Sequence, residues 1–236
     1  MKENKITFRL WGRSALFTDP ITKIGGEKCS YHLPTYEALK GVLKSIYWKP
    51  TIVWHIDRVR IIKPIRTQSK STKPQQWVGG NTLAIYTFLY DVEYQVEAHF
   101  EWNEHRPELS ADRIEGKHYS IAQRMLARGG RQDIFLGTRD CQAYVEPCEF
   151  GEGEGHYDAI DELGGYGLQF HSFGYPDETG QDELITRFWR PVLKHGILDF
   201  PRTDDPNLIC HHVRKMTKKD FHLNHNVKSV ETEEVT

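Results

Sequence analysis

The strictest pattern in the sequence is an alternation of side chains between residues 91 and 102. Apolar or aromatic residues occupy every second position from Val92 to Trp102, and polar or charged residues fill all five positions between them. Successive side chains of a β-strand point to opposite faces, so the pattern predicts a strand with one buried face and one wet face. Such a strand belongs to a sheet whose buried side is covered by helices or by another sheet.

Other segments supply the elements that this sheet needs. Residues 6–17 and 51–66 are rich in β-branched and aromatic residues and are predicted strands, as are the short segments 134–137 and 141–147. Residues 67–80 are expected to form a polar loop or hairpin tip. Thr35 can cap a helix that ends before Pro50, and its predicted buried stripe is Tyr36, Leu39, Val42, Leu43, Ile46 and Tyr47.

A second helix is predicted within residues 112–131. Ser120 and Gln123 have the spacing of a capping box, and Gly129 with Gly130 forms a stop signal. On this prediction Lys117 and His118 lie just outside the helix N-terminus, where unpaired backbone N–H groups favour an anion. The segment is therefore either a phosphodiester site or a solvated basic helix with a surface histidine.

The predicted order β-α-β-β-α-β is that of the α+β, ferredoxin-like fold found in RNA-recognition domains, with an antiparallel sheet and two helices on one face. We expect this domain to span residues 1–150. Residues 151–167 are glycine-rich and acidic, which suggests a linker or hairpin. Three short strands at 168–175, 184–190 and 196–200 then predict a small antiparallel β domain over 151–226, and the charged tail 227–236 is expected to be disordered.

Charge is distributed unevenly along the chain. The first 75 residues hold 15 lysines and arginines against 5 acidic residues, whereas the whole chain carries a formal charge of −2. Aromatic residues lie among these cations, which is the composition of a nucleic-acid footprint. The charge asymmetry fits equally well a basic face that the acidic remainder of the chain neutralises.

Targeting and metal-binding signals are not evident in the sequence. The N-terminus has no apolar core of a signal peptide and no apolar run reaches membrane-spanning length, so we expect a cytoplasmic protein without membrane contacts. The four cysteines do not form CxxC pairs and are expected to be thiols. We expect no metal site and no cofactor.

Several stretches resemble one protein family, the CRISPR-associated Cas-five family in its subtype I-C form. The similarity runs from about residue 6 to about residue 200 and is carried by ALFTDPITKIGGEK, YHLPTYEALKGVLKSIYWKP, HFEWNEHRPELSADRIEGKHYSIAQR, GGRQDIFLGTRDCQAYVEP and YPDETGQ. The resemblance implies a ferredoxin-like RAMP domain followed by a small β-rich domain. It also implies an endoribonuclease that cuts CRISPR precursor RNA at the repeat hairpin and stays with the guide RNA and other subunits in the type I-C interference complex.

The family's catalytic trio matches three positions of this sequence, Tyr47 in KSIYWKP and Lys117 with His118 in EGKHYS. These residue types suit RNA cleavage without a metal, because the ribose 2′-hydroxyl is itself the nucleophile. His118 can act as acid or base near neutral pH, Lys117 can stabilise the charge developing on phosphate, and Tyr47 can orient or deprotonate the 2′-hydroxyl. The division of roles between Tyr47 and His118 stays open, and the expected products are a 2′,3′-cyclic phosphate and a 5′-hydroxyl.

Further basic residues are candidate RNA contacts. They are Lys23, Lys28, Lys40, Lys44, Lys49, Arg124, Arg128 and Arg131. Two other functions are kept as alternatives, a non-catalytic subunit that binds the 5′ handle of a guide RNA, and a metal-dependent DNA nuclease that uses acidic groups and histidines such as His211 and His212. The more ordinary interpretation of that histidine pair is a surface loop.

Overall fold

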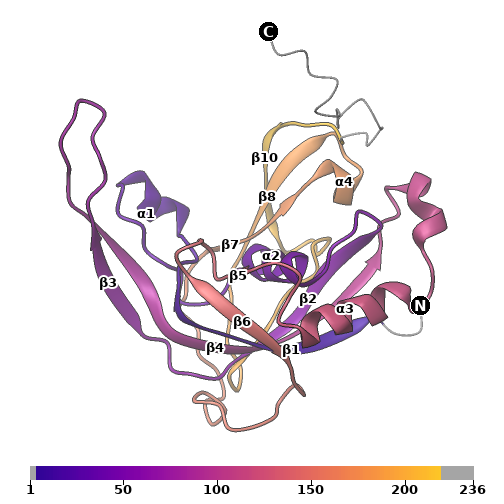
Figure 1. Ribbon diagram of the computed structural model, residues 1–236. Helices are drawn as coiled ribbons and strands as arrows, with labels where there is room; N and C mark the ends of the chain where they lie inside the picture. Colours follow the sequence, from indigo (N-terminus) through magenta and orange to yellow (C-terminus); the bar gives the residue numbers. More distant parts are fainter. Residues whose placement is uncertain (1–3, 219–236) are drawn as a thin grey trace.

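Two antiparallel sheets dominate the computed structural model, which describes residues 4–218 (Figure 1). The larger sheet has the strand order β5-β6-β1-β4-β2-β9, and β3 pairs with the N-terminal part of β4. Its strands are β1 (Lys5–Ala15), β2 (Ile52–Ile61), β3 (Thr67–Thr72), β4 (Ala84–Trp102), β5 (Ile134–Phe135), β6 (Gln142–Pro147) and β9 (Ile197–Asp199). The smaller sheet has the order β10-β8-β7 and consists of β7 (Gln169–Gly174), β8 (Glu183–Trp189) and β10 (Ile209–Lys215).

The predicted α+β, ferredoxin-like fold is confirmed. Along the chain its core runs β1, α2 (Tyr36–Ile46), β2, β4, α3 (Lys117–Ala127) and β6, and in the sheet these strands lie in the order β6-β1-β4-β2. Both helices cover the same face, since α2 packs on β2 and α3 packs on β1 and β6 (Figure 1). The remaining helices are the short segments α1 (Pro20–Ile24), η1 (Pro107–Asp112) and α4 (Pro176–Thr179).

Helix α2 begins where the sequence predicts. The Thr35 hydroxyl accepts a hydrogen bond from the Ala38 backbone N–H at 3.2 Å, and the whole predicted apolar stripe is buried. The expectation that Lys40 lies off this stripe is wrong. Lys40 is only 2% exposed, because its ammonium group forms an ion pair with Glu178, which follows the small sheet's first strand and is brought over α2 by the fold.

Helix α3 begins four residues earlier than predicted, since its N-cap is Gly116 and not Ser120. Gly116 is the N-cap in a left-handed conformation (φ 75°), no side chain caps the helix, and Gln123 hydrogen-bonds the Tyr119 hydroxyl instead of the cap. Lys117 and His118 therefore lie inside the first turn, not outside it. The predicted stop is confirmed, since the helix ends at Ala127 and Gly129 takes a positive φ of 83°.

Strand β4 begins at Ala84, seven residues before the predicted alternating segment. Its added N-terminal part pairs with strand β3, residues 67–72, which were expected to belong to a polar loop or hairpin tip. The predicted apolar face of β4 is largely buried. Its other face is not wet throughout, since Gln95 and Glu97 are also buried. Arg60 of β2 hydrogen-bonds Gln95 and the backbone oxygens of residues 152 and 153, so the loop after β6 covers this side of the sheet.

The C-terminal part differs from its predicted strand pairing. Strands β7 and β8 lie where expected, but β9 pairs with β2 at the edge of the large sheet, and the third strand of the small sheet is β10, which was expected as a loop. The division into domains at residue 150 stays a prediction. The tail 227–236 lies outside the described residues. Within the described chain, no helix combines the length and apolar character needed to cross a bilayer.

Candidate active site

Tyr47 is held at the point where α2 ends. Its backbone turns from helical to extended (φ −160°), its N–H donates to the Leu43 oxygen, and its own oxygen accepts a hydrogen bond from the Trp54 indole N–H at 2.8 Å. Only 3% of the residue is exposed. The aromatic ring is therefore fixed between α2 and the large sheet.

The first turn of α3 places the other two members of the predicted trio beside Tyr47. The Tyr47 hydroxyl and the His118 Nδ1 atom are 2.9 Å apart. The other ring nitrogen, Nε2, lies 2.8 Å from the backbone oxygen of Asp112. A carbonyl oxygen only accepts, so Nε2 carries the proton and donates it, and Nδ1 of the neutral ring accepts the hydrogen bond from the Tyr47 hydroxyl.

The His118 side chain is completely buried. The rings of Trp102 and Phe100 pack edge-on against it, with centroid distances of 5.5 and 6.4 Å. The imidazole thus has a fixed orientation and both nitrogens are occupied. His118 acts on any outside molecule through Tyr47, or after a movement that exposes it.

Asp112, the last residue of η1, connects the parts of this site. Its carboxylate forms an ion pair with the Lys117 ammonium, accepts a hydrogen bond from the Thr51 hydroxyl at 2.7 Å, and lies 3.5 Å from His118 Nε2. The hydrogen bonds from Lys117 and then Thr51 hold the pKa of this carboxyl below its ordinary value. Asp112 is therefore a permanent negative charge at neutral pH.

The phenol of Tyr47 is protonated at neutral pH. Burial raises its pKa above the ordinary value, and the Asp112 charge raises it further, while Arg131 acts in the opposite direction. Lys117 is the accessible member of the trio, with 38% of its side chain exposed. The site combines an exposed ammonium group with a phenol that can pass its proton to a neighbouring imidazole.

The predicted trio is thus one hydrogen-bonded cluster, but the sequence did not single out Asp112 or Thr51. Asp112 could have been noticed, because it opens the segment DRIEGKHYS and lies five positions before Lys117. Thr51 gave no such signal. It lies just before β2, and only the packing of η1 against that strand brings it to the site.

The candidate RNA-binding residues fall into two groups. The exposed ones are Lys23, Lys49, Arg124, Arg128 and Arg131. Lys23 lies on α1 and Lys49 lies two residues after Tyr47. Arg124 and Arg128 lie at the C-terminal end of α3, and the Arg131 N–H donates to the Ser45 oxygen of α2. Lys28 packs over the Tyr86 ring at 5.2 Å, and Lys44 pairs with Glu178 at 3.6 Å. Lys40 is buried and is not available as a surface contact.

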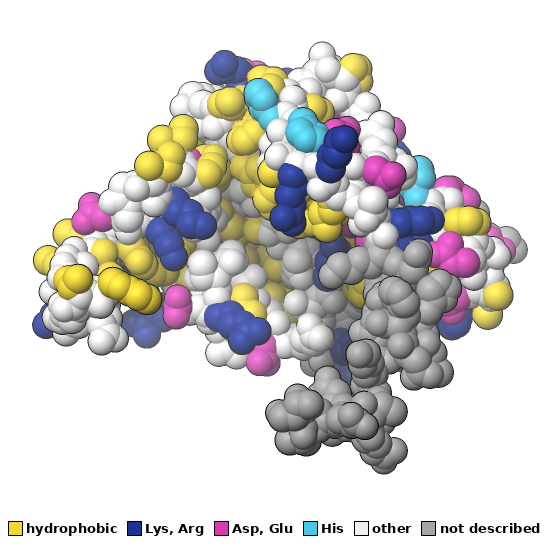
Figure 2. Space-filling view, turned by 90° about the horizontal axis from the view of Figure 1, so that it is seen from above, with side chains coloured by type: hydrophobic (Ala, Val, Ile, Leu, Met, Phe, Trp, Pro, Cys, Tyr) yellow, Lys and Arg dark blue, Asp and Glu magenta, His cyan; other side chains and the backbone are white. Residues whose placement is uncertain are grey.

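The basic first third does not form one continuous positive surface. Many of its cations pair with acids from later in the chain, for example Arg9 with Glu93 and Arg60 with Asp158. Figure 2 shows separate lysine and arginine groups among hydrophobic and neutral side chains. Neutralisation within the chain therefore accounts for much of the charge asymmetry.

His211 and His212 lie on β10 and do not belong to the trio. His212 Nδ1 is 2.7 Å from the Glu183 carboxylate on the neighbouring strand. Within residues 4–218, no three histidine, cysteine or acidic side chains converge in the manner of metal ligands.

Comparison with known proteins assigns the chain to a family. The family model described as CRISPR-associated protein (Cas5), in its Cas5d form, matches residues 5–201. The chain belongs to the Cas5d family. The match includes the whole large sheet, β7 and β8 of the small sheet, and all three residues of the candidate trio, whereas β10 lies beyond it.

Two relatives carry the name CRISPR pre-crRNA endoribonuclease Cas5d. The protein from Mannheimia succiniciproducens is 27% identical over 231 residues, covering 84% of this chain and 95% of the relative. The protein from Thermus thermophilus is 28% identical over 197 residues, covering 79% of this chain and 80% of the relative.

Two solved structures share the fold. A CRISPR-associated protein is 31% identical with a TM-score of 0.72, and protein SMU1763c from Streptococcus mutans is 33% identical with a TM-score of 0.69. Each match covers 88% of this chain and 97% of the other.

Proposed function

We propose that this chain is an endoribonuclease that cuts CRISPR precursor RNA within its repeat and that Tyr47, Lys117 and His118 carry the reaction. Both named relatives are pre-crRNA endoribonucleases. The observation that carries the proposal is the 2.9 Å hydrogen bond between the Tyr47 hydroxyl and His118 Nδ1, next to an exposed lysine at the start of a helix. Two distant segments bring an acid–base pair and a phosphate-binding cation to one place.

The proposed reaction uses the RNA's own nucleophile. A ribose 2′-hydroxyl loses its proton to the Tyr47 oxygen as the phenol passes its own proton to His118 Nδ1. The resulting imidazolium is stabilised by the Asp112 carboxylate 3.5 Å from Nε2. The 2′-oxygen attacks phosphorus and the bond to the 5′-oxygen breaks. The leaving 5′-oxygen takes a proton from the Tyr47 phenol as His118 Nδ1 returns its proton to Tyr47, which gives the 5′-hydroxyl and restores both side chains.

Lys117 has the second role. RNA phosphate would replace Asp112 as its partner, and the ammonium group would stabilise the charge that grows on the non-bridging oxygens. The backbone N–H groups of the first turn of α3 point toward the same end of the helix and add to this stabilisation. The chain's own residues supply these functions without a metal or a cofactor.

The proposal extends to the partners and the organisation of the chain. After cleavage the protein would remain with the guide RNA as a subunit of the type I-C interference complex. The ferredoxin-like RAMP domain of residues 1–150 would carry the cutting site, and the β-rich part up to residue 226 would add RNA or subunit contacts.

End-labelled repeat RNA, incubated with the purified protein in EDTA, tests the cutting function. We expect one cut per repeat, a 2′,3′-cyclic phosphate on the upstream product, and a 5′-hydroxyl on the downstream one. A 2′-deoxy substitution at the cut should abolish the reaction. His118→Ala should bind the RNA without cutting it, and unimpaired cutting by that variant would remove His118 from the mechanism.

A non-catalytic guide-binding subunit is the second candidate, and the complete burial of the His118 side chain favours it. RNA that stays intact under all conditions while binding tightly to the protein would establish this function instead. Cutting that requires a divalent ion and extends to DNA would point to the third class, a metal-dependent nuclease.

A further inference from the structure

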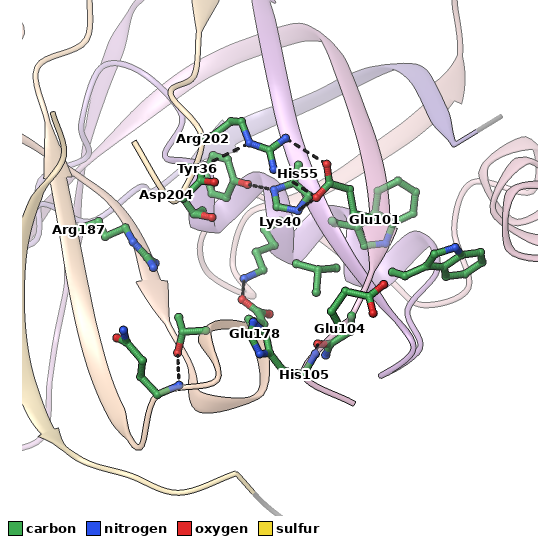
Figure 3. Close-up of a pocket in the computed structure, with 17 residues that line it drawn as sticks. Tyr36, Lys40, His55, Glu101, Glu104, His105, Glu178, Arg187, Arg202 and Asp204 are labelled. Atoms are coloured by element: carbon green, nitrogen blue, oxygen red, sulfur yellow. Dashed lines mark hydrogen bonds and ion pairs between the residues drawn. The ribbon is translucent and has the colours of Figure 1, made fainter. Parts of the chain in front are cut away.

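A cavity lies beside the candidate active site, between the large and the small sheet. Its volume is about 380 Å³. It is bounded by the ends of β2 and β4, by α2, by Arg187 of β8, and by the segment that follows β9 (Figure 3). The trio does not line this cavity, so it is a distinct site.

Most charges in the cavity wall neutralise one another. Lys40 pairs with Glu178. Arg202 makes two hydrogen bonds to Glu101, at 3.1 and 3.2 Å, and lies 3.4 Å from Asp204. Arg202 thus has two acidic partners, and Glu104, the remaining acid of the wall, pairs with Arg113 at 2.8 Å.

Arg187 is the exception. It is 93% buried, since only 7% of the residue is exposed, and it lines the cavity without a hydrogen bond or ion pair from its guanidinium to any residue of the described chain (Figure 3). A Cβ at Gly174 would lie 2.9 Å from both terminal nitrogens, so this glycine makes the room in which the guanidinium lies. An unpaired buried cation costs folding free energy, and an anionic ligand in the cavity would recover it.

The remaining wall includes ring side chains, of which Trp102, His55 and His105 are partly or fully exposed, whereas Tyr36 and Trp54 are each only 1% exposed. Tyr36, Trp54, His55, Trp102 and His105 line the same cavity. A guanidinium group binds phosphate with two parallel hydrogen bonds, and aromatic rings stack on nucleobases. A guanidinium group that can donate hydrogen bonds to a phosphate lies here beside such rings, and the volume of the cavity suits one nucleotide.

The cavity also shares a wall with the active site. The Trp102 ring packs against His118 with a centroid distance of 5.5 Å, and the Trp54 indole N–H donates to the Tyr47 backbone oxygen at 2.8 Å. The cavity and the trio are therefore separated by single side chains.

We propose that this cavity binds one nucleotide of the RNA substrate that flanks the cleaved linkage, with its phosphate on Arg187. The inference rests on the proposed function for the identity of the RNA. It makes β8 of the small sheet part of the substrate-binding surface.

Binding of labelled repeat RNA over a series of salt concentrations tests the site, with all variants made in the His118→Ala background. Arg187→Gln should weaken binding by about tenfold, the loss of one charge-assisted contact. It should also lower the slope of log Kd against log salt by about 0.7, the value for one phosphate on a single strand. Arg187→Lys, which keeps the charge, should recover part of both.

The matched control is Arg214→Gln, which removes an exposed arginine from β10 of the same sheet and should change neither value. Because Arg187→Gln removes an unpaired buried charge, its melting temperature should equal or exceed that of the parent. Arg187→Met, of similar length, replaces it if the glutamine variant does not fold.

Parent-like affinity and salt slope in Arg187→Gln would overturn the proposal, and so would a loss that Arg187→Lys does not restore at all. The two proposals fail separately. Weakened binding by Arg187→Gln supports the nucleotide site even if the protein with His118 intact cuts nothing, whereas metal-free cutting with unchanged binding by Arg187→Gln removes the nucleotide site alone.

Discussion

Tyr47→Phe is the sharpest test of the active site, because it removes one oxygen atom from the hydrogen bond between the two helix ends. The His118 side chain is fully buried, and Nε2 is already engaged with the Asp112 oxygen, so Nδ1 has no other donor within the described chain. A buried acceptor left without a partner costs about 1–3 kcal/mol of unfolding free energy. The Tyr47→Phe variant should lose that amount of unfolding free energy and stay folded at 25 °C.

Cleavage should suffer far more than stability. Without the hydroxyl, no group passes the 2′-proton to His118, and a positioned acid–base group typically contributes about 10²–10⁴-fold to a rate. The assay is single-turnover cutting of saturating labelled repeat RNA in EDTA, beside urea unfolding of the same preparation. Tyr119→Phe is the matched control, because within residues 4–218 its hydroxyl hydrogen-bonds only the exposed Gln123 amide. A Tyr47→Phe rate within about threefold of the parent, with the stability loss present, would refute the reasoning.

Three further predictions concern the neighbouring charges. Asp112→Asn should lower the pKa of Tyr47, because the Asp112 charge helps to raise it, so the pH–rate profile should shift to lower pH as the maximal rate falls; an unshifted profile would contradict this. Lys40→Met leaves Glu178 buried beside Lys44 alone and should cost about 3 kcal/mol in urea unfolding, whereas Lys49→Met, at an exposed site, should cost almost nothing. Burial lowers the pKa of His171 to about 3, so below about pH 6.5 the unfolded chain binds a proton that the folded chain does not bind. The His171 contribution to the free energy of unfolding should therefore fall by about 1.4 kcal/mol per pH unit between pH 6.5 and pH 4. His171→Phe should flatten this decline relative to the parent in urea unfolding at each pH.

The sequence predicts the ferredoxin-like core well, because its signals are local. The Thr35 cap, the apolar stripe of α2 and the alternation in β4 each depend on near neighbours in the chain. The start of α3 was predicted wrongly because Gly116 can take a left-handed conformation that permits an earlier start, and the capping box at Ser120 is a weaker signal than that turn.

The candidate site was predictable only as far as its motif residues. Lys117 and His118 were singled out from their place at a predicted helix start, and the family resemblance joined Tyr47 to them. Their proximity was a hypothesis until the fold placed the end of α2 beside the start of α3. The contact between Lys40 and Glu178 spans 138 residues, and nothing near either position announces it. Arg187 was equally unpredictable from the sequence, because only the tertiary structure shows that no acidic side chain of residues 4–218 pairs with it.

Strand β9 has a consequence for how the chain folds during synthesis. Residues 197–199 close the β2 edge of the large sheet, and Asp158 holds Arg60 on the covered side of that sheet. Until the ribosome has produced these residues, the N-terminal portion carries an open strand edge that can pair with another nascent chain. A fragment that stops at residue 150 should therefore aggregate more readily than one that continues through residue 201.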